Sequence, residues 1–306
     1  MRTPEELPSD LPSYFSVTDA RERGLGWARV RRSDLRAPYS GIRARIVDPV
    51  GTSLSERCAE YAPRLADWQF FSHETALGLH GAPMPEWPYR PELHVSAHRP
   101  TREPRVPGIR GHRLQLREPA TQAGIRGLPV EHPVRAWRQA GTTWRLDDLI
   151  AAGDYLVSGA RPLASIAELA EEIEVMGDLR SRLLSRALSE IRVGVRSARE
   201  TKLRLVLVRG GLPVPEVNWV LRDRAGRAVA ELDLAFPRWR VAAEYDGRVH
   251  EMDSSQFAKD SDRWDRVRAQ GWQHVRVMNH HMSGGAQLAV AKVRRALVDA
   301  GWRPGH

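Results

Sequence analysis

The chain concentrates acidic side chains between residues 230 and 250. Four carboxylates fall within this stretch: Glu231, Asp233, Glu244 and Asp246. Carboxylates gathered on one face repel one another unless a cation lies between them, and oxygen-rich sites of this kind suit Mg²⁺ or Mn²⁺. The simpler alternative is a pair of solvated strands with their acids facing water. Because Gly247 follows directly and His250 lies three residues further on, we interpret the stretch as a site.

Two apolar runs must position these acids, and a proline break separates them: Val229 to Phe236 and Val241 to Tyr245. This pattern predicts two strands joined by a tight connection. Side chains alternate across a strand, so Glu231 and Asp233 are expected to share one face. Glu244 and Asp246 are expected to share a face for the same reason. If the connection makes a hairpin, Asp233 and Glu244 lie nearly opposite each other on adjacent strands.

The surrounding elements predict a small α/β sheet. The expected order is helix 197–209, strand 214–221, the two acidic strands, helix 254–270, strand 273–278 and helix 283–300. This αβββαβα order describes a sheet with helices on its faces. Ser197 and Glu200 have capping-box spacing, so Glu200 either closes the first helix or joins the acids. Asp260 and Arg263 lie three residues apart on one face of their helix, so we expect either an ion pair or a phosphate contact there.

The N-terminal stretch predicts a basic winged helix-turn-helix over residues 13–49. Thr18 is expected to cap a helix that ends at Arg23, a glycine turn follows, and a second helix extends from Trp27 to Leu35. Residues 37–43 are expected to form the wing. The second helix of such a motif enters the major groove of DNA, which makes three arginines candidate DNA contacts: Arg29, Arg31 and Arg32. The alternative is a small basic helical hairpin that packs on the rest of the chain.

The middle of the chain is predicted to form an α+β domain over residues 50–158 and a helical connector over residues 159–195. Six histidines are spread through the α+β domain without consistent metal-ligand spacing: His73, His80, His94, His98, His112 and His132. We interpret them as surface or hydrogen-bonded side chains rather than as metal ligands.

Composition places the chain among globular proteins. Hydrophobic residues make up 42% and charged residues 28% of the 306 residues, and no apolar run approaches the ~18 residues of a membrane span. The single Cys58 excludes an intramolecular disulfide and a Cys-rich zinc site. The N-terminus has no apolar signal core, so we expect a cytoplasmic protein with no membrane partner.

Positive charge gathers towards the two ends of the chain, which has a net charge of +9. Residues 13–45 carry eight Lys+Arg against three Asp+Glu, and residues 196–306 carry twenty against thirteen. Two basic ends predict two surfaces that face phosphate, with DNA as the partner and no small-molecule cofactor. The oligomeric state is left open.

A family resemblance lies in the C-terminal third. Residues 197–300 resemble the Vsr-like endonuclease domains of the PD-(D/E)XK nuclease superfamily. The matching residues are Glu200, Asp233, Glu244-Tyr245-Asp246-Gly247, His250, Asp260, Arg263 and Gly271-Trp272. Residues 13–155 are similar to AbiEi-type abortive-infection antitoxins through Ser72-His73-Glu74-Thr75-Ala76 and Gly127-Leu128-Pro129-Val130. The expected fold is therefore α/β (α+β overall), with a restriction-endonuclease-like domain over residues 196–306.

The nuclease resemblance implies a divalent-metal-dependent DNA endonuclease that hydrolyses phosphodiester bonds with Mg²⁺ or Mn²⁺. Asp233 and Glu244 would be the leading metal ligands. Asp246 and Glu200 would be further ligands, and His250 the proton-transfer group. Three basic side chains would contact phosphates: Lys202, Arg248 and Arg263.

Two departures from the superfamily pattern keep an alternative open. Asp246 stands where the superfamily has its lysine, and Leu232 rather than proline precedes Asp233. Vsr-like domains often lack that lysine, so activity is still expected. The alternative is a DNA-binding regulator or antitoxin-like protein whose nuclease fold is catalytically inert.

Overall fold

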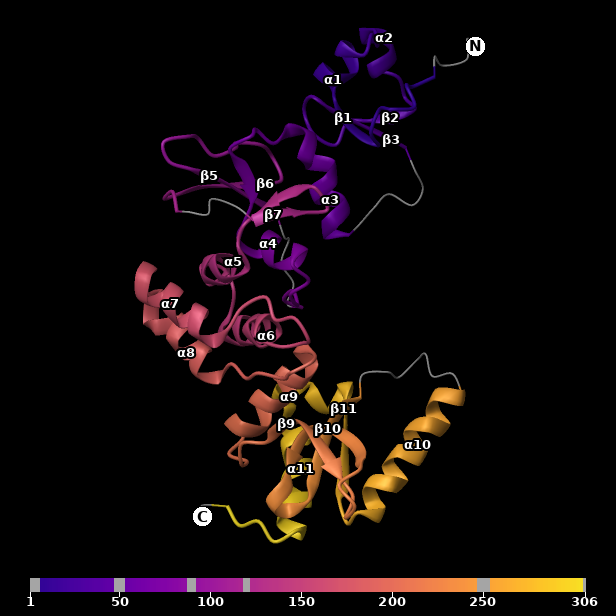
Figure 1. Ribbon diagram of the computed structural model, residues 1–306, viewed down its shortest axis with the longest axis vertical. Coiled ribbons are helices and arrows are strands. Elements are labelled where there is room, and N and C mark those ends of the chain that lie inside the picture. Colours follow the sequence, from indigo (N-terminus) through magenta and orange to yellow (C-terminus); the bar gives the residue numbers. More distant parts are fainter. Residues whose placement is uncertain (1–5, 47–52, 87–91, 118–121, 247–253, 305–306) are drawn as a thin grey trace. The chain divides into compact units, whose positions relative to one another are not determined.

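A computed structural model describes residues 6–46, 53–86, 92–117, 122–246 and 254–304 as a mixed α/β protein (Figure 1). The chain divides into two compact units, Met1–Ala140 and Gly141–His306. Among the described residues, no helix is long and apolar enough to span a membrane.

The first unit begins with a small antiparallel sheet and two short helices. Its elements are β1 (Tyr14–Ser16), α1 (Val17–Glu22), α2 (Trp27–Val30), β2 (Leu35–Arg36) and β3 (Ile42–Arg45), in the strand order β1-β3-β2. Ala20 and Val30 are fully buried and Gly24 has a φ of 85°, as the predicted crossing of two helices requires. Ser16 rather than Thr18 caps α1, because the Ser16 Oγ accepts a 2.9 Å hydrogen bond from a backbone N–H.

The second helix is shorter than predicted. It ends at Val30 rather than at Leu35, because Leu35 is a buried strand residue that pairs with Arg45. Arg31 and Arg32 therefore follow the helix instead of lying on it. Strands β2 and β3 form a hairpin at the position predicted for the wing.

The rest of the first unit surrounds a five-stranded sheet. Its helices are α3 (Leu54–Tyr61), the 3₁₀ turn η1 (Ala62–Arg64), α4 (His73–Leu79) and α5 (Pro133–Ala140). Its strands are β4 (Gln69–Phe71), β5 (Leu93–His98), β6 (Ile109–Leu114), β7 (Gln122–Ile125) and β8 (Leu128–Val130). The order is β6-β5-β4-β8-β7, in which β5 pairs with β6 and β4 with β8 in parallel.

The second unit joins three helices to a four-stranded sheet. The helices α6 (Leu146–Leu156), α7 (Ile166–Met176) and α8 (Leu183–Glu190) come first, with the 3₁₀ turn η2 (Arg180–Arg182) before α8. The main elements that follow are α9 (Ala198–Arg209), β9 (Glu216–Arg222), β10 (Ala228–Phe236), β11 (Val241–Asp246), α10 (Ser254–Ala269), β12 (Gln273–Met278) and α11 (Gln287–Asp299). Three short 3₁₀ turns complete this part: η3 (Pro237–Trp239), η4 (Asn279–Met282) and η5 (Gly284–Ala286). The order from α9 onwards is the predicted αβββαβα, and the sheet order is β12-β11-β10-β9.

Helices cover both faces of this sheet. On one face, buried side chains of α9 and α11 such as Leu203 and Val293 pack with Leu234 of β10. On the other face, Val267 of α10 packs with Leu232 of β10. Burial on both sides explains why β10 and β11 are apolar except at their acidic positions.

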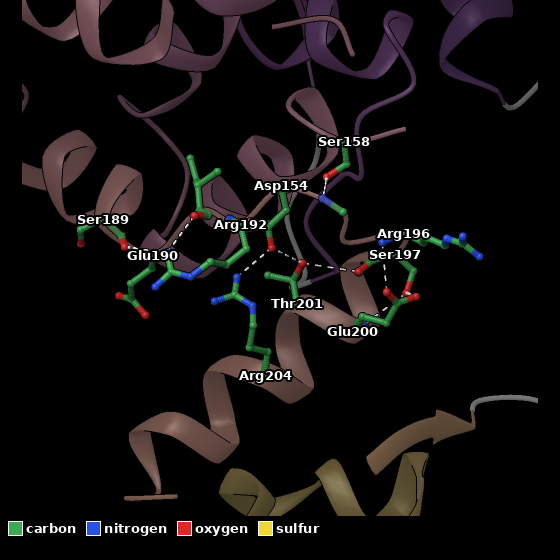
Figure 2. Close-up of polar contacts among 12 residues, drawn as sticks. Asp154, Ser158, Ser189, Glu190, Arg192, Arg196, Ser197, Glu200, Thr201 and Arg204 are labelled. Carbon is green, nitrogen blue, oxygen red and sulfur yellow. Dashed lines mark hydrogen bonds and ion pairs between the residues drawn. The ribbon is translucent and has the colours of Figure 1, made fainter. Parts of the chain in front are cut away.

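A buried ion pair connects α6 to α9 (Figure 2). The Arg204 Nη2 lies 2.8 Å from the Asp154 Oδ2, and the two side chains are 3% and 1% exposed. The Thr201 Oγ1 donates a 2.7 Å hydrogen bond to the same carboxylate, and the Arg192 N–H donates one of 2.7 Å to its Oδ1. Both helices belong to the second unit, Gly141–His306.

Candidate active site

Strands β10 and β11 form the antiparallel hairpin expected from the sequence. Their pairing ends at Leu234 opposite Ala243. Asp233 and Glu244 are the next residues on the two strands, so they occupy adjacent positions just beyond the last pair. The hairpin therefore brings these two acids to the same end of the β10–β11 ladder.

Regular alternation breaks at Asp233. Leu232 and Leu234 belong to hydrophobic clusters on opposite faces of the sheet, although a regular strand would direct both to one face. On the neighbouring strand β9, Asn218 has a left-handed φ of 48°. Asn218 falls between the residues that pair with Leu232 and Leu234. This irregularity changes the direction of the Asp233 side chain from that of a uniform strand.

Asp233 is partly buried in a negative environment. Burial, followed by the charge of Glu200, raises the pKa of its carboxyl from 3.8 to about 6. The charge of Glu231 acts in the same direction, while Arg263 and Arg196 oppose the rise. A bound cation would stabilise the charged form of a carboxyl whose pKa is raised by burial and by neighbouring carboxylates.

Glu200 lies in the first turn of α9 and serves there as a capping residue (Figure 2). The Ser197 Oγ donates a 2.9 Å hydrogen bond to the Glu200 Oε1 and accepts one of 3.2 Å from the Glu200 N–H. The Arg196 N–H donates a 3.0 Å hydrogen bond to the Glu200 Oε2. Glu200 therefore caps the helix, and its charge also raises the pKa of Asp233.

Glu244 is held by Arg263 of α10. The Arg263 Nη2 lies 2.8 Å from the Glu244 Oε1, and its Nη1 donates a 3.4 Å hydrogen bond to the Oε2. Arg263 also donates to the backbone carbonyl of Glu231 and covers the Trp264 ring at 4.5 Å from its centroid. This guanidinium therefore joins β10 and β11 across the hairpin. The side chain of Asp260, considered as its partner, lies outside the described residues.

Asp246 forms an ion pair with Arg276 of the adjacent strand β12. Tyr245, between Glu244 and Asp246, packs against the cluster on the α9 and α11 face. Its hydroxyl donates a 3.1 Å hydrogen bond to the Asn279 Oδ1.

His274 of β12 is a neighbour of the acids that sequence reasoning missed. Its Nε2 lies 3.9 Å from the Glu244 Oε2, and its ring stacks on Trp264 with the centroids 3.3 Å apart. Within the described part of the chain this Nε2 is buried without a hydrogen-bond partner. Burial, followed by the charge of Arg263, lowers the pKa of the imidazole to about 3, so the ring is neutral at pH 7. The parallel register of β11 and β12 is what places it there, opposite Ala242.

Of the remaining candidates in the second unit, the structure describes Lys202 but not Arg248 or His250. Lys202 lies partly buried on α9. Arg248 and His250, the predicted phosphate contact and proton-transfer group, lie outside the described residues, as does Gly247.

The predicted DNA contacts of the first unit differ in their exposure to solvent. Arg29 is buried, and its guanidinium donates hydrogen bonds of 3.1 and 2.8 Å to the Asp34 carboxylate. Arg31 is exposed and lies over the ring of Trp27, 5.2 Å from its centroid. Arg32 is also exposed. Trp27 itself is 49% exposed, so Arg31 and Arg32, unlike Arg29, are accessible to a polyanion.

A group of potential metal ligands lies elsewhere. Three histidines each offer a ligand atom within 4.8 Å of the others: His73, His94 and His112. In the parts of the chain that the structure describes, no other set of three His, Cys, Asp or Glu side chains is grouped in this way. Their spacing in the sequence does not indicate this grouping, and His73 and His94 are buried rather than at the surface. The fold nevertheless gathers them, because α4, β5 and the parallel strand β6 meet there.

Two proteins of Mycobacterium tuberculosis, the uncharacterized proteins MT2308 and Rv2248, are similar to part of the chain. Each is 32% identical to it over 101 residues, which is 33% of this chain and 37% of the relative. The chain therefore aligns with well under half the length of these relatives. No protein-family model matches the chain, and no solved structure matches it.

Proposed function

We propose that the protein is a metal-dependent DNA endonuclease whose centre includes Asp233. The observation that carries this proposal is the position of Asp233, partly buried beside Glu200 and Glu231, with its pKa raised to about 6. Isolated acidic strands on a wet face do not produce such a shift, because water screens their charges. The αβββαβα order and the adjacent position of Glu244 support the same function.

The two carboxylates at one end of the hairpin are of the donor type that a hard divalent cation prefers. Asp233 and Glu244 would hold Mg²⁺ or Mn²⁺, with Glu200 and Asp246 as further carboxylates. When bound, the ion would supply positive charge to the phosphate oxygens and make its water more acidic. Arg263 forms an ion pair with Glu244 and is 29% exposed. In this proposal it would contact a phosphate when Glu244 binds a metal cation instead.

DNA binding would draw on both units. In the first unit, Trp27, Arg31 and Arg32 are exposed, and the hairpin β2–β3 has the position of a wing. Contacts of this kind position a protein on the phosphate backbone without giving it sequence specificity. In the second unit, Lys202, Arg248 and Arg263 remain the proposed phosphate contacts.

A second candidate is a DNA-binding regulator with an inert nuclease fold. The observation that favours it is that Arg263 and Arg276 neutralise Glu244 and Asp246. Among the described residues these acids do not converge as the histidines of the first unit do. Together with the missing lysine, this pairing would leave a folded domain that needs no metal.

Plasmid cleavage distinguishes the two candidates. The full chain is incubated with supercoiled DNA and Mg²⁺ or Mn²⁺, and the Asp233→Ala variant is compared with a Glu216→Ala control. Glu216 is an exposed acid of the same sheet, on β9. We expect the wild type and the control to nick the plasmid and Asp233→Ala to lose the activity while still melting cooperatively. Cleavage by Asp233→Ala at the wild-type rate, or no cleavage by any of the proteins, would favour the inert regulator.

A further inference from the structure

The three histidines of the first unit form a compact cluster in which two imidazole nitrogens face each other. The His112 Nε2 and the His94 Nδ1 are 3.1 Å apart. The His73 ring stacks on His112 with the centroids 3.7 Å apart, and its centroid lies 5.3 Å from that of His94. His73 and His94 are 4% and 2% exposed, so the cluster is an interior feature with His112 at its margin.

We propose that His73, His94 and His112 bind one divalent transition-metal ion of the Zn²⁺ class, with a further coordination position left open. Imidazole is a preferred ligand of Zn²⁺, Cu²⁺ and Ni²⁺ but not of Mg²⁺. Zinc–nitrogen bonds of roughly 2.0–2.1 Å in a tetrahedral site place two ligand nitrogens about 3.3 Å apart. The 3.1 Å separation of His112 Nε2 and His94 Nδ1 already matches that spacing.

The neighbouring groups select the nitrogens that would face the ion. The Ser72 Oγ lies 2.9 Å from the His73 Nδ1, which leaves the His73 Nε2 for the metal. The His94 Nε2 faces the Glu74 Oε1 at 3.7 Å, which leaves the His94 Nδ1. A carboxylate behind a ligating imidazole is a usual partner in metal sites, because it fixes the tautomer and strengthens the ligand.

The protonation state and charge of the cluster fit a metal ligand set. Burial lowers the pKa of all three imidazoles, to about 2 for His73, about 3 for His94 and about 4 for His112. Neutral rings supply lone pairs at pH 7, as metal binding requires. Arg110 opposes a cation here by its charge, whereas the buried Glu74 carboxylate favours one.

The backbone at His73 is strained in a way that supports a binding role. Its φ is 51°, a left-handed value that L-residues rarely adopt, at the first position of α4. The Gln139 side chain holds this conformation by accepting a 3.0 Å hydrogen bond from the His73 N–H. Strain of this kind persists where the surroundings over-determine a conformation, and it is common at functional sites.

The test is metal titration of the full chain after treatment with a chelator. We expect one equivalent of Zn²⁺ to bind, Co²⁺ to give the visible absorption of a four- or five-coordinate site, and Mg²⁺ to leave that absorption unchanged. His112→Gln, at the half-buried margin on the edge strand β6, should weaken Zn²⁺ binding at least tenfold. His98→Gln, on the same strand as His94 but outside the cluster, is the matched control and should bind as the wild type does.

Glu74→Gln supplies a second variant if His112→Gln does not fold. Removing a carboxylate behind a ligand typically weakens metal affinity by roughly 10–100-fold, whereas a purely structural Glu74 would leave affinity unchanged. Absence of stoichiometric Zn²⁺ binding to the folded wild type would overturn the site, as would equal affinity in wild type, His112→Gln and Glu74→Gln. The proposal is independent of the nuclease, because all three histidines belong to the first unit and Asp233 to the second.

Discussion

Replacing Asp233 by asparagine should stabilise the metal-free protein at neutral pH. The asparagine keeps the size of the side chain but cannot carry the charge that burial and the charges of Glu200 and Glu231 disfavour. Most substitutions of partly buried polar residues destabilise a protein, so a gain in stability would be specific to this electrostatic environment.

The magnitude follows from the displaced pKa of Asp233. A rise from 3.8 to about 6 corresponds to about 3 kcal/mol of stability lost when the carboxyl ionises in the folded state. Because water reaches the partly exposed carboxyl, we expect asparagine to recover about 1–3 kcal/mol at pH 7.5.

The sign of the pH dependence is equally specific. Between pH 3.8 and about 6 the folded protein holds the Asp233 proton more tightly than the unfolded chain does. The Asp233 contribution to stability therefore falls as the pH rises through this window and is constant above it. Asp233→Asn should match the wild type near pH 4 and exceed it at pH 7.5.

The assay is urea denaturation of both proteins from pH 4 to pH 8 in a chelator, because subtracting the two curves removes the effect of every other titrating group. Saturating Mg²⁺ should then stabilise the wild type and leave Asp233→Asn unchanged. Parallel stability curves for the two proteins in the chelator would refute the electrostatic reasoning. Equal stabilisation of both by Mg²⁺ would refute Asp233 as a ligand.

Three further substitutions test other parts of the structure. Asp154→Ala should lower the unfolding free energy, measured by urea denaturation, by about 3–5 kcal/mol, because it leaves the Arg204 guanidinium buried without a carboxylate. Adding Arg204→Met should restore part of that loss. Full stability of the single variant would contradict this role. Arg31→Ala should weaken duplex DNA binding and reduce the slope of log K against log[salt] by roughly 0.9 without changing the melting temperature. Arg29→Ala should instead destabilise the protein by about 2 kcal/mol, because its hydrogen bonds to Asp34 are lost. Equal salt slopes for the wild type and Arg31→Ala would remove Arg31 from the interface.

Local patterns predicted the second unit well. The order of its helices and strands from α9 onwards follows from apolar runs, capping residues and glycines, which act over a few residues. The hairpin that brings Asp233 and Glu244 together was predictable for the same reason. The predicted second helix of the first unit was too long, because the strand pairing of Leu35 with Arg45 overrode local helical preference.

The surroundings of the candidate site could not be predicted from spacing. Arg263 reaches Glu244 only because α10 packs on the sheet, and His274 approaches it only through the register of β11 and β12. The histidine cluster has the same origin. His112 pairs with Ser96, two residues beyond His94, so the parallel register alone places the two histidines on one face.

The contact between Asp154 and Arg204 limits how the chain can be divided. A piece that begins at residue 196 would keep all four strands of the C-terminal sheet but would lose α6 and the partner of Arg204. Such a piece would carry an unneutralised interior charge and an apolar surface where α6 had been. A fragment that keeps this contact, whether transferred to another chain or produced alone, therefore begins near Gly141 and includes the helices before the sheet.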